Sequence, residues 1–138
     1  MNEIEKRALE MLLAGENKAL EVLRTQLRTA TVASREFTGV GFFTRLAVSP
    51  ASPRLEGRRK LAISDVYAEV NGLAHDAGFV LFVNDGAIDC LECFIVDEHW
   101  PEDATIKRAY YVRPEPAGSS NLIESPKRDL EWASRHAF

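Results

Sequence analysis

The N-terminal part of the chain carries apolar residues at helical spacing: Ile4, Ala8 and Leu12. Asn2 followed by Glu5 has the spacing of a capping box. In this motif the side chain of each residue accepts the backbone N–H of the other at the start of a helix. A second segment starts near Asn17 and repeats the pattern with leucines on one face: Leu20, Leu23 and Leu27. The pattern therefore predicts two amphipathic helices.

After Thr29 the apolar period shortens to that of β-strands. Segments rich in β-branched and aromatic residues follow one another at 29–33, 40–48, 63–70, 79–83, 87–91 and 106–112. We expect an α+β fold in which two N-terminal helices pack on an antiparallel sheet of about five or six strands. Residues 1–113 are predicted to form a single domain. Residues 114–138, which begin with a loop-like composition, are predicted to form a tail with a short helix from Lys127 to His136.

The strongest local signal is a β-hairpin that turns at Asp85-Gly86, between two short apolar runs. Asp-Gly favours this two-residue turn because both central residues need a positive φ. The expected register opposes Val83 to Ile88, Leu81 to Cys90, and Phe79 to Glu92. Leu91 and Cys93 are then expected on the face opposite to Leu81.

Charge is distributed unevenly along the chain, although the net charge is only −4. All 17 Lys and Arg residues lie outside the stretch between Leu61 and Ile106. That stretch contains ten acids: Asp65, Glu69, Asp76, Asp85, Asp89, Glu92, Asp97, Glu98, Glu102 and Asp103. An acidic sheet repels phosphate, so we expect no nucleic-acid partner there.

Composition narrows the class of protein further. The chain is 46% hydrophobic and 28% charged, which excludes disorder throughout. No apolar run approaches the roughly 18 residues that a membrane span needs. The first residues lack the features of a signal peptide, and two cysteines build no disulfide framework. We therefore expect a cytoplasmic protein that needs no membrane.

Cys90 and Cys93 form a CxxC pair, which can indicate a metal or redox site. In a strand, residues three apart point to opposite faces with Cα atoms about 10 Å apart, beyond the roughly 7 Å that a disulfide spans. We expect both thiols to be structural. The sequence thus predicts no metal and no cofactor.

Histidines and carboxylates offer weaker candidates. The histidines His75, His99 and His136 have no partner at ligand spacing along a helix or strand. A metal site from His75, His99 and Asp97 needs the two loops that carry them to meet.

Among the acids, Asp89 and Glu92 are expected on opposite faces of one strand. Glu92 could instead pair with Asp65 or Glu69 from a neighbouring strand. Ordinary outward-facing acids that keep the sheet soluble are the simpler interpretation.

Thr38-Gly39-Val40-Gly41 contains a G-x-G that precedes a strand, unlike a dinucleotide-binding motif, in which a helix follows. Gly39 and Gly41 share a face and could leave a groove for a ligand. A β-bulge filled by a neighbouring aromatic side chain is the simpler explanation.

Several segments carry a resemblance to a known group of proteins: Leu12-Leu13-Ala14-Gly15, Thr38-Gly39-Val40-Gly41-Phe42-Phe43, Ala77-Gly78-Phe79-Val80-Leu81-Phe82, Leu91-Glu92 and Trp100-Pro101-Glu102. In these segments the chain resembles a small bacterial family of uncharacterised α+β proteins. The family pattern often has Gly after Leu-Glu, where this chain has Cys93. The resemblance implies a compact α+β domain and transfers no catalytic residue.

Together these features predict a non-catalytic protein-interaction domain with an acidic face, of an inhibitor or immunity type or a homodimer. Its partner would be another protein or a second copy of the chain. The alternative is a small-ligand-binding protein or a hydrolase that uses Glu92, Asp97 and His99 beside Gly39 and Gly41, with or without a divalent metal.

Overall fold

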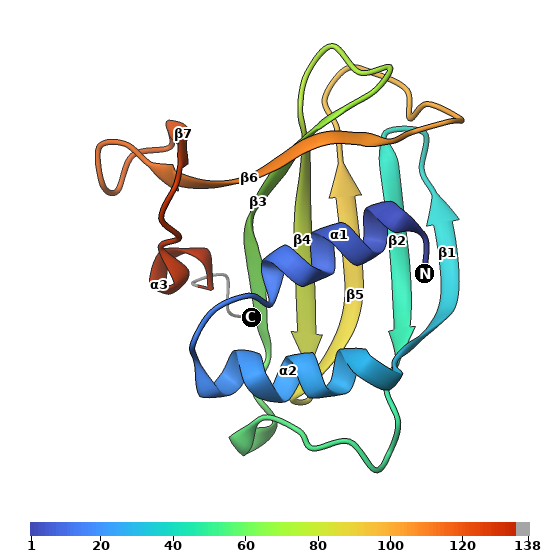
Figure 1. Ribbon diagram of the computed structural model, residues 1–138, viewed down its shortest axis with the longest axis vertical. Coiled ribbons are helices and arrows are strands. Elements are labelled where there is room, and N and C mark those ends of the chain that lie inside the picture. The colour runs from blue at the N-terminus through green and yellow to red at the C-terminus, as the bar shows by residue number, and fades with distance from the viewer. Residues whose placement is uncertain (135–138) are drawn as a thin grey trace.

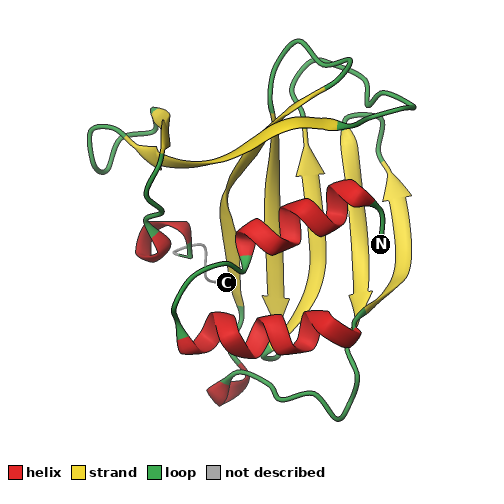
Figure 2. Ribbon diagram, in the orientation of Figure 1, coloured by secondary structure: helices red, strands yellow, loops and turns green. Residues whose placement is uncertain are grey.

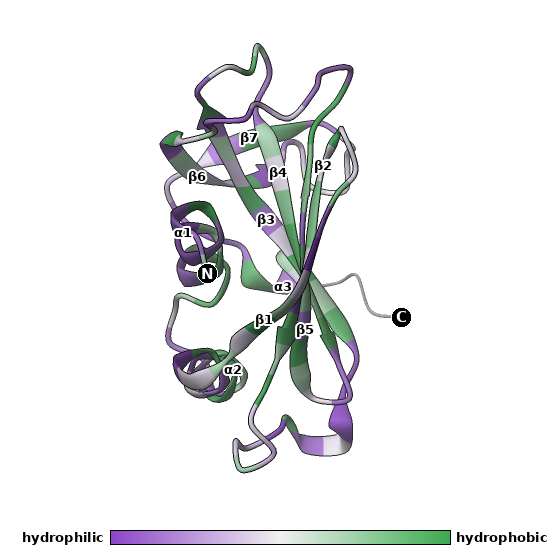
Figure 3. Cartoon of the chain, turned by 90° about the vertical axis from the view of Figure 1, so that its right-hand side faces the viewer, coloured by the Kyte–Doolittle hydropathy of each residue, from purple (hydrophilic) through white to green (hydrophobic). Residues whose placement is uncertain are grey.

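The computed structural model describes residues 1–134, in which two helices lie on one face of a sheet (Figure 1 and Figure 3). The helices are α1 (Glu3–Leu12) and α2 (Lys18–Thr29). The predicted capping box is present, because the Asn2 side chain accepts the Glu5 N–H and the Glu5 side chain accepts the Asn2 N–H. Asn17 caps α2 in a similar way, through the N–H groups of Ala19 and Leu20.

Within residues 1–134, seven strands form one antiparallel sheet in the order β1-β2-β5-β4-β3-β6-β7 (Figure 2). The strands are β1 (Thr31–Phe37), β2 (Gly41–Ala47), β3 (Leu61–Val70), β4 (Ala77–Asn84), β5 (Ala87–Phe94), β6 (Ile106–Pro114) and β7 (Leu122–Ser125). This confirms the α+β fold and the antiparallel sheet, but the expected count of five or six strands is wrong. The strand that the pattern missed is β7, because it lies within a loop-like composition and pairs only with the end of β6.

Residues 114–134 pack on the body of the sheet. Besides β7 they contain the short helix α3 (Leu130–Ala133), which contacts β3 and buries Ala133. A helix was expected from Lys127, but α3 starts three residues later, where the Asp129 side chain accepts the Trp132 N–H. The expected end of this helix at His136 lies outside the described residues.

The turn at Asp85-Gly86 is present as predicted, and φ is 53° at Asp85 and 76° at Gly86. The predicted register beyond the first pair is wrong. Val83 opposes Ile88, but Leu81 opposes Leu91 and Phe79 opposes Cys93. The cause is a β-bulge that places Asp89 as an extra residue in β5.

This bulge decides which side chains enter the core, because a shift of one residue exchanges the two faces of a strand. Leu91 and Cys93 join Phe79 and Leu81 beneath the helices, and all four are buried. Cys90 and Glu92 consequently lie on the opposite face of the sheet.

Candidate functional site

The antiparallel connections divide the loops between two ends of the sheet (Figure 1). One end, here called the acidic end, consists of residues 38–40, 71–76 and 95–105, which contain no Lys or Arg. It carries five acids: Asp76, Asp97, Glu98, Glu102 and Asp103. The other, here called the basic end, consists of residues 48–60 and 85–86. It carries four bases, Arg54, Arg58, Arg59 and Lys60, and two acids, Glu56 and Asp85, which leaves it a net positive charge. The fold thus converts the uneven charge along the sequence into two ends of opposite sign.

Specific hydrogen bonds join the three loops of the acidic end. The Trp100 N–H donates to the Gly39 carbonyl oxygen at 3.0 Å. The Glu98 carboxylate accepts the N–H groups of Ala74 at 2.7 Å and His75 at 2.9 Å. These two bonds lower the pKa of Glu98 below its ordinary value. The acidic end is therefore a connected surface and not three independent loops.

Gly39 and Gly41 have different environments. A Cβ added to Gly41 would lie 2.0 Å from the Cys93 carbonyl oxygen, and the φ of Gly41 is 143°. Gly41 therefore permits β2 to approach β5 closely, and neighbouring backbone fills the space that a groove would need. Gly39 has open space around it and lines a cavity.

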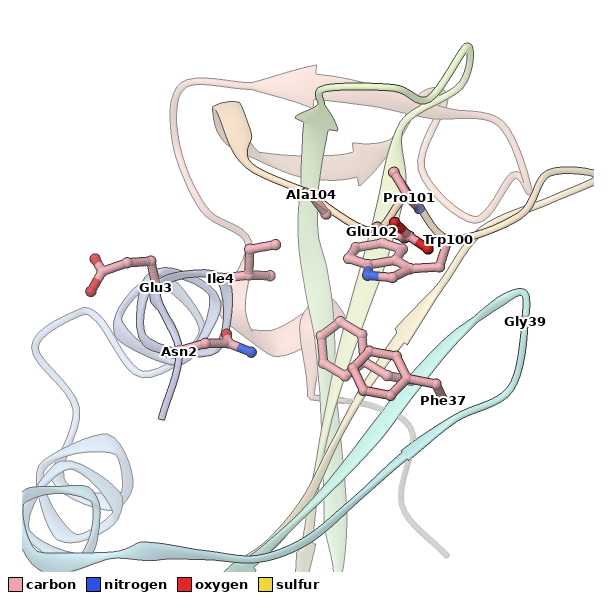
Figure 4. Close-up of a pocket in the computed structure, with 10 residues that line it drawn as sticks. Asn2, Glu3, Ile4, Phe37, Gly39, Trp100, Pro101, Glu102 and Ala104 are labelled. Atoms are coloured by element: carbon pink, nitrogen blue, oxygen red, sulfur yellow. The ribbon is translucent and has the colours of Figure 1, made fainter.

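This cavity, with a volume of about 490 Å³, lies between α1 and the aromatic side chains of the acidic end (Figure 4). Three rings from β1, β2 and the 95–105 loop line it: Phe37, Phe42 and Trp100. The ring centroids of Phe42 and Trp100 are 5.3 Å apart, and those of Phe37 and Phe42 are 6.1 Å apart. We call this space the aromatic cavity. Ile4 of α1 and Asn2, the N-cap residue of that helix, lie on its other side.

The charged side chains that line the aromatic cavity are both acidic, Glu3 and Glu102. Glu3 is 3.7 Å from Lys6 in an exposed ion pair. Glu102 is exposed and forms no hydrogen bond or ion pair with any residue of the described part, 1–134. The carboxylate of Glu102 is therefore available to a ligand.

One exposed apolar side chain lines the aromatic cavity, and two more lie in loops of the acidic end that contribute other residues to it. Phe37 is 61% exposed, Val40 is 50% exposed and Val96 is 63% exposed. A hydrogen bond from the Ile95 N–H to the Val40 carbonyl oxygen at 3.0 Å holds the chain beside Val96 against the β1–β2 turn. An exposed aromatic side chain that lines a cavity is a feature of binding surfaces.

The candidate residues Glu92, Asp97 and His99 are not brought together at this cavity. Glu92 lies on β5 opposite Phe43 and Val80, and burial raises its pKa. Asp97 and His99 are exposed in the 95–105 loop, and none of the three residues lines the aromatic cavity. Of the five predicted site residues, only Gly39 does so.

The acids expected to pair with Glu92 have other partners. Asp65 is fully buried and forms two hydrogen bonds, of 2.8 and 2.9 Å, with Arg128. Glu69 binds Arg108 at 2.5 Å. Asp89 was expected on the face opposite to Glu92, which is wrong. The Asp89 carboxylate accepts a hydrogen bond of 3.0 Å from the guanidinium of Arg45. Arg45 opposes Cys90 in β5 and lies on the face of the sheet that carries Glu92.

The histidines and cysteines considered as metal ligands lie in two loops and on strand β5. The loops with His75 and His99 do meet, but Glu98 joins them through backbone N–H groups. Within residues 1–134 no group of three or more His, Cys, Asp or Glu side chains could hold a metal ion. Cys90 and Cys93 lie on opposite faces as expected, and burial raises the pKa of both thiols.

The aromatic cavity could not be predicted from the sequence, because Trp100 lies 58 positions after Phe42 and 63 positions after Phe37. Phe37 ends a strand and Trp100 precedes a proline, and neither setting indicates a ligand. Phe37 could have indicated a binding surface, since a large aromatic residue beside a glycine turn is not needed to form that turn.

Comparisons with known proteins returned no match to this chain among protein-family models, curated proteins or solved structures. The resemblance to a bacterial family therefore stays a prediction. In the described part of the chain, the helices are too short and too polar for one of them to span a bilayer.

Proposed function

We propose that this protein is a non-catalytic protein-interaction domain that binds a basic partner protein at the acidic end. The observation that carries the proposal is that an aromatic cavity with exposed apolar surroundings opens at the end where the acidic loops meet. Protein interfaces combine these two properties, a few aromatic anchors and complementary charge around them.

The charge distribution supports a basic partner. The loops of the acidic end carry five acids and no Lys or Arg, whereas four bases lie at the opposite end. Such a separation orients an approaching basic surface toward the acidic end and raises its association rate, by an amount that falls with added salt.

The aromatic cavity supports a specific contact in addition to general attraction. Binding energy in protein interfaces is concentrated in a few side chains that enter well-packed pockets. Phe37, Phe42 and Trp100 supply such a pocket, and Val40 and Val96 are exposed in the two loops that also contribute Gly39 and Trp100 to it. The alternative ligand or hydrolase function rested on Glu92, Asp97 and His99, none of which lines this cavity.

Site-specific photo-cross-linking in cells tests the proposal. We would place p-benzoylphenylalanine at Phe37, which lines the aromatic cavity next to the acidic end, and, as a control, at the exposed Ala51 in the basic end. The cross-linked peptides would be sequenced by mass spectrometry. We expect Phe37 to capture a peptide rich in Lys and Arg, and Ala51 not to capture it.

Charge reversal supplies a matched control. Glu102→Lys with Asp103→Lys should abolish the cross-link, whereas Glu10→Lys with Glu16→Lys, an equal change of charge on exposed helix and loop positions, should preserve it. A cross-link from Phe37 that both double variants retain, or a captured peptide without basic residues, would contradict the proposal.

A further inference from the structure

The aromatic rings that line the aromatic cavity are inclined to one another. The ring planes of Phe42 and Trp100 are inclined by 74°, and those of Phe37 and Phe42 by 55°. The three rings therefore stand at different inclinations around the cavity. Figure 4 shows Trp100 and Glu102 on the same wall, across from Asn2 and Ile4.

The electrostatic environment of the aromatic cavity favours a positive charge. Among residues 1–134 no Lys or Arg lines it, and the two charged residues that do are the acids Glu3 and Glu102. Arg7 lines a smaller adjoining cavity of about 200 Å³.

The positive end of the α1 dipole also lies beside the cavity. Acids at Glu3 and Glu5 in the first turn offset that dipole, and the capping box occupies the N–H groups of Asn2 and Glu5. The carboxylate of Glu102 has no such internal partner among residues 1–134.

Aromatic faces beside a carboxylate are the chemistry that recognises a guanidinium group. A guanidinium is planar and weakly hydrated, so it stacks on aromatic rings while its N–H groups donate to a carboxylate. A lysine ammonium is a compact and strongly hydrated charge, which loses more hydration in an apolar pocket.

We infer that the aromatic cavity receives an arginine side chain of the basic partner, with the guanidinium against Trp100 and paired with Glu102. This inference rests on the proposed function and adds the chemistry of the central contact. Phe37 and Ile4 then cover the aliphatic part of the arginine side chain.

Fluorescence of Trp100 provides the test, because the chain has only two tryptophans. In a Trp132→Phe background Trp100 is the single reporter. The probes are three acetylated tripeptide amides, Gly-X-Gly, in which X is arginine, citrulline or lysine. Citrulline has the shape of arginine with a neutral urea group, so the comparison isolates the charge.

We expect the arginine peptide to change Trp100 fluorescence in a saturable way and to bind about 3- to 30-fold more tightly than the citrulline peptide. The lysine peptide should bind more weakly than the arginine peptide. Glu102→Gln should remove most of the preference for arginine over citrulline. Glu10→Gln, a matched change at an exposed position outside the cavity, should leave it unchanged.

Equal affinity for the arginine and citrulline peptides would overturn the inference, and so would the absence of saturable binding by either. Both results are separable from the proposed function. A cross-link from Phe37 to a basic peptide that is lost in the Glu102→Lys, Asp103→Lys variant would still stand in those cases, and only the arginine contact would be withdrawn.

Discussion

The carboxylate of Glu5 forms two hydrogen bonds of 2.8 Å with the guanidinium of Arg35, and the Glu5 side chain is fully buried. Thr44 donates a third hydrogen bond to the same carboxylate at 2.5 Å. Glu5 thus serves both as the capping residue of α1 and as the link between α1 and strands β1 and β2. The aromatic cavity lies beside this link, since Ile4 lines it and precedes Glu5.

Acid should weaken this link. Burial alone would raise the pKa of Glu5, but hydrogen bonds from Arg35, Thr44 and the Asn2 backbone bring it below the ordinary value of 4.5. A carboxyl whose folded pKa is lowered stabilises the fold above its unfolded pKa, and this contribution is lost as pH falls through the folded value. We therefore expect Glu5→Gln to reduce the free energy of unfolding at neutral pH by about 1–3 kcal/mol.

Urea unfolding followed by tryptophan fluorescence measures this effect at pH 7 and at several values below 4.5. The difference between wild type and Glu5→Gln should shrink as the pH falls, because the wild-type carboxylate becomes protonated. A difference that stays constant with pH would contradict the role of the ionised carboxylate.

The ion pair between Asp65 and Arg128 should be important for stability. Asp65 is fully buried, and Arg128 also donates to the carbonyl oxygens of Leu12 and Ala14 at 2.7 and 2.8 Å. Arg128→Ala would leave a buried carboxylate unpaired, at a cost of about 3–5 kcal/mol. Thermal or urea unfolding checks this value. Arg113→Ala, which removes an exposed ion pair with Glu115 at 3.4 Å, should cost less than about 1 kcal/mol. Equal losses of stability in the two variants would contradict the stronger role of the buried ion pair.

The two glycines of the β1–β2 turn should respond differently to alanine. Gly41→Ala places a Cβ against the Cys93 carbonyl oxygen and should cost at least about 2 kcal/mol. Gly39→Ala meets no atom within 4 Å and has a φ of 86°, so its cost is the conformational strain of about 1–2 kcal/mol. Equilibrium unfolding of both variants tests which substitution costs more free energy of unfolding. If Gly41→Ala costs no more than Gly39→Ala, the close approach of β2 to β5 does not determine the residue at position 41.

Two ends of opposite charge should also promote contact between copies of this chain. We expect a concentration-dependent increase in apparent mass at about 0.01 M salt and its disappearance at about 1 M, where the Debye length falls from about 30 Å to 3 Å. Size-exclusion chromatography with light scattering measures this. A constant monomer mass at every salt and protein concentration would remove the homodimer expectation.

The helices and the hairpin turn could be predicted from the sequence because their determinants are local. Asn2 and Glu5 are three positions apart in a capping box, and Asp85-Gly86 supplies both positive φ values of its turn. The uneven distribution of charge along the chain could also be seen in the sequence alone. Only the antiparallel strand order, however, placed the acids of the 71–76 and 95–105 loops at one end.

The remaining features depend on contacts between distant segments. The bulge at Asp89 shifts the register of β5, so that Leu91 and Cys93 are buried beneath the helices. β7 forms although its own sequence resembles a loop, because β6 offers an edge for pairing.

The sequence by itself determined the two capped helices, the turn at Asp85-Gly86 and a chain that separates its charges. The tertiary structure decided which face each β5 side chain occupies, which acids are buried in ion pairs, and that Phe37, Phe42 and Trp100 line one cavity. The physical reason is the range of the determining interactions. Caps and turns depend on neighbours in sequence, whereas burial, ion pairing and cavities depend on packing between segments whose alignment a single strand pattern does not specify.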